Sequence, residues 1–370
     1  MKPILCLACA GAALGVAWGC GPTEVVVGEA PGVARVVAGV LGVPFEFAVR
    51  DTVGPGPAID APLGLPAGLV AWDDGRFLFA DRLRQRVGSV TADGILTWPI
   101  GRGRCGFPGL TGQRADSVCL AEPEGLAIGD GVLFVTDRRG HRAYQVDLVA
   151  NRVEVLLGTG TAGVAAEGVT AATAPTNLPT GIGVGPDGAV YVAETGNHRI
   201  VRVEPGGTVS AYVGSGIVGD GGDGGPAVAA NLSSPVGLAW EGDTLYVADA
   251  GNNRIRRVIG DTIRAFAGLG AVGFAGDRGP AAAALFDRPG ALAVVGTLLF
   301  VADRGNQRIR VIRLGPDSID TFAGTGKAEV GADLLEVGRT AIAGPAGIAA
   351  AGRVVLVSDS GGYVVRRVIR

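Results

Sequence analysis

Short apolar runs alternate with clusters of turn residues along most of the chain. In residues 244–258, a run of strand formers is followed by a short polar turn segment and then by apolar residues that alternate with arginines. This pattern predicts a β-hairpin. Similar phrases occur at residues 299–312 and 355–368, and again earlier in the chain, so the hairpin belongs to a repeat.

Three markers define six copies of this repeat. Each copy has an acidic residue at the end of the first hairpin strand, namely Asp81, Asp137, Glu194, Asp249, Asp303 and Asp359. The spacings between these acids are 56, 57, 55, 54 and 56 residues. An arginine follows five residues later in five copies, as Arg86, Arg142, Arg199, Arg254 and Arg308. A proline precedes each acid by 14 or 15 residues, at Pro66, Pro123, Pro179, Pro235, Pro289 and Pro345.

A repeat of this length with four short strands is typical of a propeller blade. In the fourth copy the expected strands are residues 236–240, 244–249, 255–259 and 262–268, here called strands a, b, c and d. Because proline donates no ladder hydrogen bond, its place at the start of strand a costs the sheet nothing. We therefore predict an all-β, six-bladed β-propeller of four-stranded blades over residues 33–370.

The two ends of the repeat region predict how the ring closes. The last copy stops after its third strand, whereas residues 34–47 are similar to residues 265–276, which form strand d and the loop after it. An N-terminal strand is thus expected to complete the last blade. Such closure removes the exposed sheet edges that an open array would leave.

The phrases at residues 249–254, 222–227 and 235–238 resemble the NHL-repeat family, and the resemblance extends over about residues 33–370. It implies the propeller fold but says little about function, because the family includes receptor sensor domains, protein- and RNA-binding modules and a zinc-dependent lyase class. The second copy departs from the pattern at residues 136–146, and the sixth has Val364 in place of the arginine.

The first residues resemble a bacterial lipoprotein signal. Lys2 precedes an apolar run, residues 4–19, which is too short for a comfortable membrane span, and Cys20 follows it. We predict a signal peptide at residues 1–19, lipidation at Cys20 and a lipid-anchored linker at residues 20–32. The protein would be exported and held in the bacterial cell envelope. Simple export is the alternative, because Trp18 is unusual before a lipidated cysteine.

Two cysteines remain in the predicted propeller. Cys105 and Cys119 are 14 residues apart, and an exported protein can keep a disulfide between them. Closing a loop of this size contributes about 3 kcal/mol in the chain-entropy model. A two-cysteine metal half-site is the less favoured alternative, because neither histidine nor a second cysteine pair lies nearby in the sequence.

Composition narrows the class of partner. The hydrophobic content of 48% is sufficient for a core, and the 64 glycines suit many tight turns. A net charge of −3 argues against a nucleic-acid-binding domain, which would be strongly basic.

The repeat acids and arginines are interpreted as structural. They flank the b–c turn, where each acid is expected to pair with the arginine five residues later and to organise the turn. Exposed pairs of this kind contribute about 0–1 kcal/mol. The b–c turns and the d–a loops share one face of the ring. Because loops as long as residues 214–234 are often functional, we expect this face to bind the ligand.

Candidate metal ligands are few. Asp220, Asp223 and Asp277 lie in glycine-rich loops and could hold calcium, although glycine turns and aspartate caps explain the same residues better. His141 and His198 each lie four residues after a repeat acid, so a turn position explains both. With Glu194 they could bind zinc. No catalytic residue is assigned and no cofactor is predicted, with calcium or zinc as the alternatives.

The sequence favours a binding module over an enzyme. The expected partner is a protein, peptide or glycan of the cell envelope, with the membrane reached through the lipid anchor and with no nucleic acid; the oligomeric state is left open. The alternative is a metal-dependent lyase or a lactonase-like hydrolase with its site at the mouth of the propeller axis. That alternative requires Glu194, Asn197, His198 and their counterparts to converge on one point.

Overall fold

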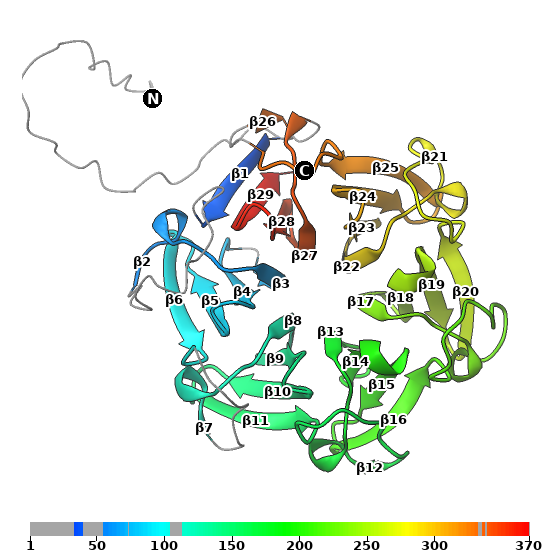
Figure 1. Ribbon diagram of the computed structural model, residues 1–370, viewed down its shortest axis with the longest axis horizontal. Coiled ribbons are helices and arrows are strands. Elements are labelled where there is room, and N and C mark those ends of the chain that lie inside the picture. The colour runs from blue at the N-terminus through cyan, green and yellow to red at the C-terminus, as the bar shows by residue number, and fades with distance from the viewer. Residues whose placement is uncertain are drawn as a thin grey trace, which may run out of the picture.

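The computed structural model shows six antiparallel sheets arranged as blades around a central axis (Figure 1). It describes residues 33–39, 55–72, 74–103, 113–331, 335–336 and 339–369. The predicted six-bladed, all-β propeller is confirmed. Strand a of each blade lies nearest the axis, and strand d runs round the rim.

The first three blades follow one another in chain order. Blade 1 consists of β3 (Pro66–Ala71), β4 (Phe77–Asp81), β5 (Arg86–Val90) and β6 (Ile95–Ile100). Blade 2 consists of β8 (Pro123–Gly129), β9 (Val132–Asp137), β10 (Arg142–Asp147) and β11 (Arg152–Leu157). Blade 3 consists of β13 (Pro179–Val184), β14 (Val190–Glu194), β15 (Arg199–Val203) and β16 (Thr208–Val213).

The last three blades repeat this order. Blade 4 consists of β17 (Pro235–Glu241), β18 (Thr244–Asp249), β19 (Arg254–Ile259) and β20 (Thr262–Ala267). Blade 5 consists of β22 (Pro289–Val295), β23 (Leu298–Asp303), β24 (Arg308–Arg313) and β25 (Ser318–Ala323). Blade 6 consists of β27 (Pro345–Ala351), β28 (Val354–Asp359), β29 (Val364–Ile369) and β1 (Val33–Ala38). Every strand a begins at the predicted proline.

The N-terminal strand closes the ring as predicted. β1 pairs antiparallel with β29, with Ala34 opposite Val368 and Val36 opposite Arg366. Ala34 is buried in a cluster formed by blades 5 and 6. The first strand of the propeller therefore belongs to the sheet made by its last residues.

The d–a loops carry more structure than the sequence indicates. In five blades a two-residue strand pairs with the outer side of strand d: β2 (Gly56–Pro57), β7 (Gln113–Arg114), β12 (Val169–Thr170), β21 (Gly279–Pro280) and β26 (Leu335–Glu336). Blade 4 has a single bridge there, between Pro226 and Thr262. Short 3₁₀ turns follow these segments at η1 (Ala58–Asp60), η2 (Ala115–Ser117), η3 (Ala171–Thr173), η5 (Ala227–Ala229) and η7 (Ala281–Ala283). The loops are therefore fastened to the rim.

The hydrophobic core lies between neighbouring blades. One cluster joins Tyr246 and Phe266 of blade 4 to Leu292, Val301 and Ile312 of blade 5. Each middle strand therefore buries both faces, which explains why strand b is apolar throughout rather than alternating.

The N-terminal predictions fall outside the described part of the chain. Residues 1–19, Cys20 and the linker at residues 20–32 are among the residues that the structure does not describe, and so is Cys105. Cys119 takes part in a disulfide, whereas its pairing with Cys105 stays a prediction. Among the described residues, no helix has the length and apolar character that crossing a membrane requires.

Candidate functional site

The repeat acids hold the blades' d–a loops in place. Asp249 Oδ1 accepts a hydrogen bond from the Ser233 amide at 2.7 Å, just before the proline that begins strand a. Asp303 accepts the equivalent bond from the Asp287 amide at 2.9 Å. All six acids are fully buried. Their predicted structural role is therefore supported by their contacts, and the b–c turn does lie beside the end of the d–a loop.

In most blades the repeat acid pairs with an arginine other than the expected one five residues later. Asp249 contacts Arg256 at 3.5 Å and Asp303 contacts Arg310 at 3.4 Å, both seven residues after the acid. In blade 6 the same position supplies Arg366, which lies 3.1 Å from Asp359. These arginines are buried, so the expectation of an exposed pair was wrong for them.

Blades 1 and 3 use other arginines. The expected pair at five residues forms in blade 3, where Glu194 Oε2 lies 2.6 Å from Arg199 Nε. Blade 3 has Val201 seven residues after the acid, so the arginine five residues after it is the one that pairs. In blade 1, Asp81 lies 3.7 Å from Arg84 instead.

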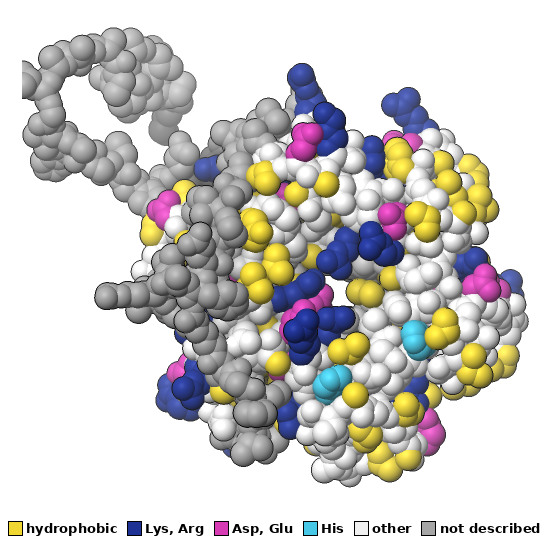
Figure 2. Space-filling view, viewed as in Figure 1, with side chains coloured by type: hydrophobic (Ala, Val, Ile, Leu, Met, Phe, Trp, Pro, Cys, Tyr) yellow, Lys and Arg dark blue, Asp and Glu magenta, His cyan; other side chains and the backbone are white. Residues whose placement is uncertain are grey.

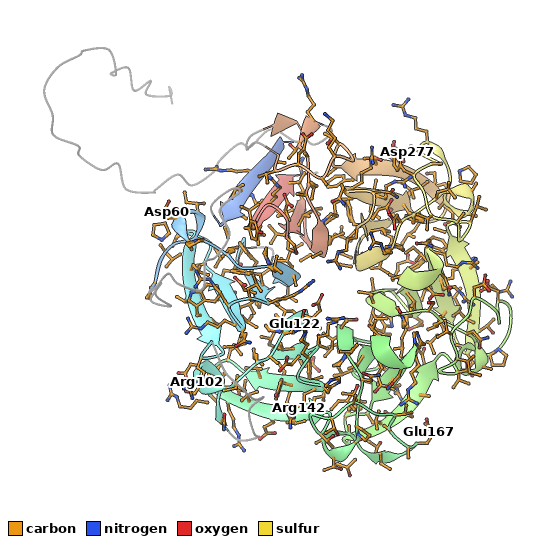
Figure 3. All side chains as sticks on the ribbon, in the orientation of Figure 1. Asp60, Arg102, Glu122, Arg142, Glu167 and Asp277 are labelled. Carbon is orange, nitrogen blue, oxygen red and sulfur yellow. The ribbon has the colours of Figure 1, made fainter. Side chains whose placement is uncertain are left out.

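The candidate calcium ligands contact arginines. Asp223 lies 2.8 Å from Arg256, and Asp277 lies 2.6 Å from Arg310. Asp220 lies 3.4 Å from Arg254. A buried guanidinium is costly unless it is paired, so these loops supply its counterions. Asp277 lies at the rim, far from the axis (Figure 3).

The two histidines join neighbouring blades. His198 Nδ1 accepts a hydrogen bond from the Ser234 amide at 3.0 Å, and His141 Nδ1 accepts one from the Leu178 amide at 3.3 Å. In blade 4, Asn253 Oδ1 accepts the equivalent bond from the Arg288 amide at 3.0 Å. The histidines therefore occupy a repeated turn position, as the sequence indicated.

The residues required for a zinc site do not converge. Glu194 pairs with Arg199, His198 binds a backbone amide, and Asn197 donates to the Gly163 carbonyl at 2.8 Å. In the described ranges, no group of three or more histidine, cysteine or acidic residues is arranged to hold a metal ion.

A charged cluster at the mouth of the central channel was not predicted. The residues that directly follow the repeat acids are Arg82, Arg138, Thr195, Ala250, Arg304 and Ser360. In blades 1, 3 and 6 this residue contacts strand a of the next blade, through Arg82, Thr195 and Ser360. Thr195 donates to the Pro235 carbonyl at 2.6 Å, which shows how close this position is to the innermost strand. Figure 2 shows basic and acidic side chains gathered around the central opening. Glu122 also lies there (Figure 3).

Two glutamates compensate part of this positive charge. Arg82 lies 2.7 Å from Glu124, and Glu122 lies 3.2 Å from Arg138 and 3.1 Å from Arg139. Burial raises the pKa of Glu124 despite the nearby Arg82, and Glu122 adds to that effect. Glu124 Oε2 has no hydrogen-bond partner among the described residues although it is buried.

Arg304 lacks a direct ion pair of this kind within the described residues. Its side chain is exposed and makes no hydrogen bond or ion pair within the described residues, while Arg288 beside it pairs with Asp287 at 3.0 Å. Desolvation lowers the pKa of Arg304. The charges of Arg82, Arg288 and Arg138 lower this pKa further, and the charge of Glu124 offsets part of the effect. We call Arg82, Glu124, Arg138, Arg288 and Arg304, with Glu122, Asp287 and Arg139, the channel mouth. Its arginines outnumber its acids, so it suits an anionic group.

Comparison with known proteins agrees with the fold. The NHL repeat model matches residues 176–203, which contain β13, β14 and β15. The chain is a six-bladed propeller that carries an NHL repeat. NHL repeat-containing protein 2 of Homo sapiens is 25% identical over 289 residues, and that of Bos taurus is 26% identical over 291 residues. Both matches cover 68% of this chain, which spans about two fifths of the length of these relatives.

Solved structures share the propeller architecture at low sequence identity. An auxiliary nutrient-binding protein of Bacteroides thetaiotaomicron has a TM-score of 0.64 and 13% identity, covering 91% of this chain and 76% of that chain. A gluconolactonase of Xanthomonas campestris has a TM-score of 0.56 and 14% identity, covering 92% and 98%. These similarities show the fold alone.

Proposed function

We propose that this NHL-repeat propeller is an exported, lipid-anchored binding module that holds an anionic group of its ligand at the channel mouth. The observation that carries the proposal is Arg304, whose side chain forms no ion pair within the described residues and lies among the charges of Arg82, Arg288 and Arg138, with Glu124 as the one acid that acts on it. An incoming carboxylate or phosphate would pair with its planar guanidinium and relieve the repulsion from Arg82 and Arg138.

The ligand would be a protein, peptide or glycan of the cell envelope that carries such a group. The nutrient-binding and laminin-complex proteins that share the fold are binding proteins by name, which supports the proposal by analogy. A hydrolytic or lyase activity is not proposed, because the contacts of Glu194, Asn197 and His198 give no observation in its favour.

The test is anion binding by wild type and by Arg304→Gln. Citrate and inorganic phosphate are titrated calorimetrically at constant ionic strength. We expect Arg304→Gln to weaken binding by about tenfold or more, since a hydrogen bond to a charged group contributes about 1.5–3 kcal/mol. Arg313→Gln is the matched control, because Arg313 is an exposed arginine at the far end of β24 in the same blade. Equal binding by wild type and Arg304→Gln would refute the proposal.

The pH dependence of binding gives a second readout. Because the pKa of Glu124 is raised, this residue takes up a proton above the ordinary value of 4.5 as the pH falls. The protonated form removes a negative charge that faces Arg82, Glu122, Arg138 and Arg304. Affinity for the anion should therefore rise as the pH decreases through this range and fall as the pH increases. Glu124→Gln should remove most of the dependence.

A further inference from the structure

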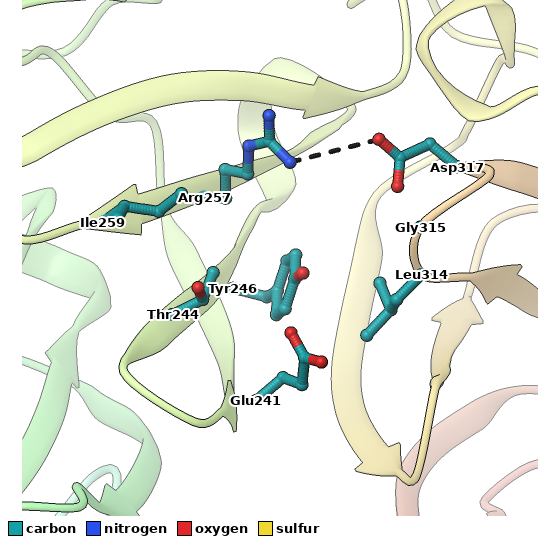
Figure 4. A pocket seen from close by; sticks show the side chains of 8 residues that line it. All are labelled: Glu241, Thr244, Tyr246, Arg257, Ile259, Leu314, Gly315 and Asp317. Carbon is teal, nitrogen blue, oxygen red and sulfur yellow. Dashed lines mark ion pairs between the residues drawn. The ribbon is translucent and has the colours of Figure 1, made fainter.

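A cavity of about 330 Å³ lies between blades 4 and 5, beside their a–b and c–d turns (Figure 4). It shares no residue with the channel mouth. Polar and apolar side chains line it, chiefly Glu241, Tyr246, Arg257, Ile259, Leu314 and Asp317. Its volume falls in the range of small-molecule sites, about 300–1,000 Å³.

The repeat supplies an internal comparison in blade 3. Tyr191 and Arg202 stand three residues before and eight residues after the repeat acid, as Tyr246 and Arg257 do in blade 4. In blade 3, Asp187 accepts hydrogen bonds from both Tyr191 and Arg202. Asp187 Oδ2 accepts from the Tyr191 hydroxyl at 2.9 Å, from Arg202 Nε at 3.0 Å and from Arg202 Nη2 at 2.7 Å. Arg202 also pairs with Glu204.

Blade 4 has the same donors, Tyr246 and Arg257, but lacks both of the acceptors found in blade 3. Counted back from the acid, Gly242 replaces Asp187 in a turn that is one residue shorter, and Ile259 replaces Glu204. Arg257 Nε is buried without a hydrogen-bond partner within the described residues. The Tyr246 hydroxyl makes no hydrogen bond there either. The nearest carboxylate to Arg257 is Asp317 of blade 5, at 4.0 Å.

Tyr246 and Arg257, the donors without a hydrogen-bond partner within the described residues, are already held in position. The Arg257 guanidinium lies over the Phe266 ring at 5.3 Å, and the Tyr246 ring packs against the same phenylalanine at 4.9 Å. Tyr246 is 3% exposed, so its ring is fixed by packing. Holding the donors in place before binding reduces the entropy that a ligand must overcome.

We propose that this cavity binds a small organic carboxylate, whose oxygen takes the place that Asp187 occupies in blade 3. The carboxylate accepts hydrogen bonds from Tyr246 and Arg257. Its body lies against Leu314 and Ile259, the apolar side chains of the lining.

The charges around the cavity permit this ligand. The lining contains Arg257 with the acids Glu241 and Asp317, and Arg264 stands opposite Arg257 on the neighbouring strand β20. A bound carboxylate would give this group one excess negative charge. That balance already exists in blade 3, where Arg202 holds both Asp187 and Glu204.

The experiment is a ligand-observed NMR titration of the protein with benzoate, with benzyl alcohol as the neutral analogue. The titration uses the Arg304→Gln background, so that the channel mouth does not contribute. We expect Arg257→Gln and Tyr246→Phe each to weaken benzoate binding by about tenfold, because each removes a donor to a charged group. Tyr191→Phe is the matched control and should leave the affinity unchanged, because the blade 3 triad is closed by Asp187.

A variant that introduces a carboxylate beside Arg257 provides an independent test. Ile259→Glu supplies the counterpart of Glu204 at a half-exposed strand end, so Arg257 should become occupied and benzoate should be excluded. Thermal melting verifies that each variant is folded. The proposal is overturned if benzoate does not bind, if it binds Arg257→Gln as tightly as the parent, or if benzyl alcohol binds as tightly as benzoate. Retention of benzoate binding in the Arg304→Gln background separates this site from the proposed function.

Discussion

At the scale of single residues, the buried repeat acid contacts three segments of its blade, namely the d–a loop, the b–c turn and strand c. Asp303 accepts the Asp287 amide of the d–a loop, contacts Asn306 of its own turn and faces the buried Arg310 of strand c. Arg310 in turn contacts Asp277 of the loop. Since each of these groups is withdrawn from water, the network is stabilising only while every charge keeps its partner.

Removing one charged partner from this network should destabilise the folded protein. We expect Arg310→Met to lower the free energy of unfolding by about 3–5 kcal/mol, because Asp303 would remain buried and unpaired. Arg313→Gln, an exposed arginine of the same strand, should change it by less than about 0.5 kcal/mol. Urea unfolding followed by circular dichroism measures both.

The double variant Asp303→Asn/Arg310→Met distinguishes a charge effect from a packing effect. It should recover part of the loss, since no unpaired charge remains. A single variant as stable as wild type would contradict the network described here.

The channel mouth was visible in the sequence only in part. Arginine follows the repeat acid in three copies, at Arg82, Arg138 and Arg304, and that regularity could have indicated a shared position. The sequence could not show where the side chains of these arginines point. Arg138 and Arg139 are adjacent, and only the fold shows that both reach Glu122 on the strand a side of the axis.

At the scale of elements, ring closure depends on one six-residue strand that is remote in sequence from its partner. β1 lies between β29 and β26, and Ala34, Val36 and Ala38 are buried. The d–a loops add short outer strands to the same ring. Their two-residue length and irregular composition give no periodic signal, so the sequence could not predict them.

Removing the closing strand tests this arrangement. Deletion of residues 33–39 should lower the free energy of unfolding by at least about 3 kcal/mol, since burial of one valine side chain alone contributes about 1.5–3 kcal/mol and ladder hydrogen bonds are lost as well. Removal of residues 21–30 is the control and should have little effect on thermal melting. Unchanged melting after the first deletion would contradict closure by β1.

At the scale of the whole molecule, the ring separates two kinds of site. The residue after the repeat acid is arginine in three copies and uncharged in the other three, so differences between copies produce a charged channel mouth. Asp187 accepts from the tyrosine of blade 3, whereas a cavity lies where blade 4 lacks the corresponding acceptors. Divergence between copies, rather than the repeat itself, therefore creates both candidate sites.

The proposed attachment to the cell envelope concerns the whole chain and can be tested directly. We expect Cys20→Ser to release the protein from the membrane fraction into the soluble fraction, because the proposed lipid-bearing side chain is lost. Fractionation and immunoblotting measure the distribution, with Cys119→Ser as the cysteine control. A Cys20→Ser variant that stays in the membrane fraction would refute the lipid anchor.

The fold could be predicted from the sequence, because a fixed spacing of proline, acid and arginine, together with short apolar runs separated by turn residues, is sufficient to specify hairpins and their number. It also indicated that His141 and His198 are turn residues, since each stands at the same place in its copy. The tertiary structure decided which charges meet. Arg256 rather than Arg254 faces Asp249, and Asp223 reaches Arg256 from a loop 33 positions away in the numbering. Such pairs depend on side-chain reach and burial between blades, which linear spacing does not encode.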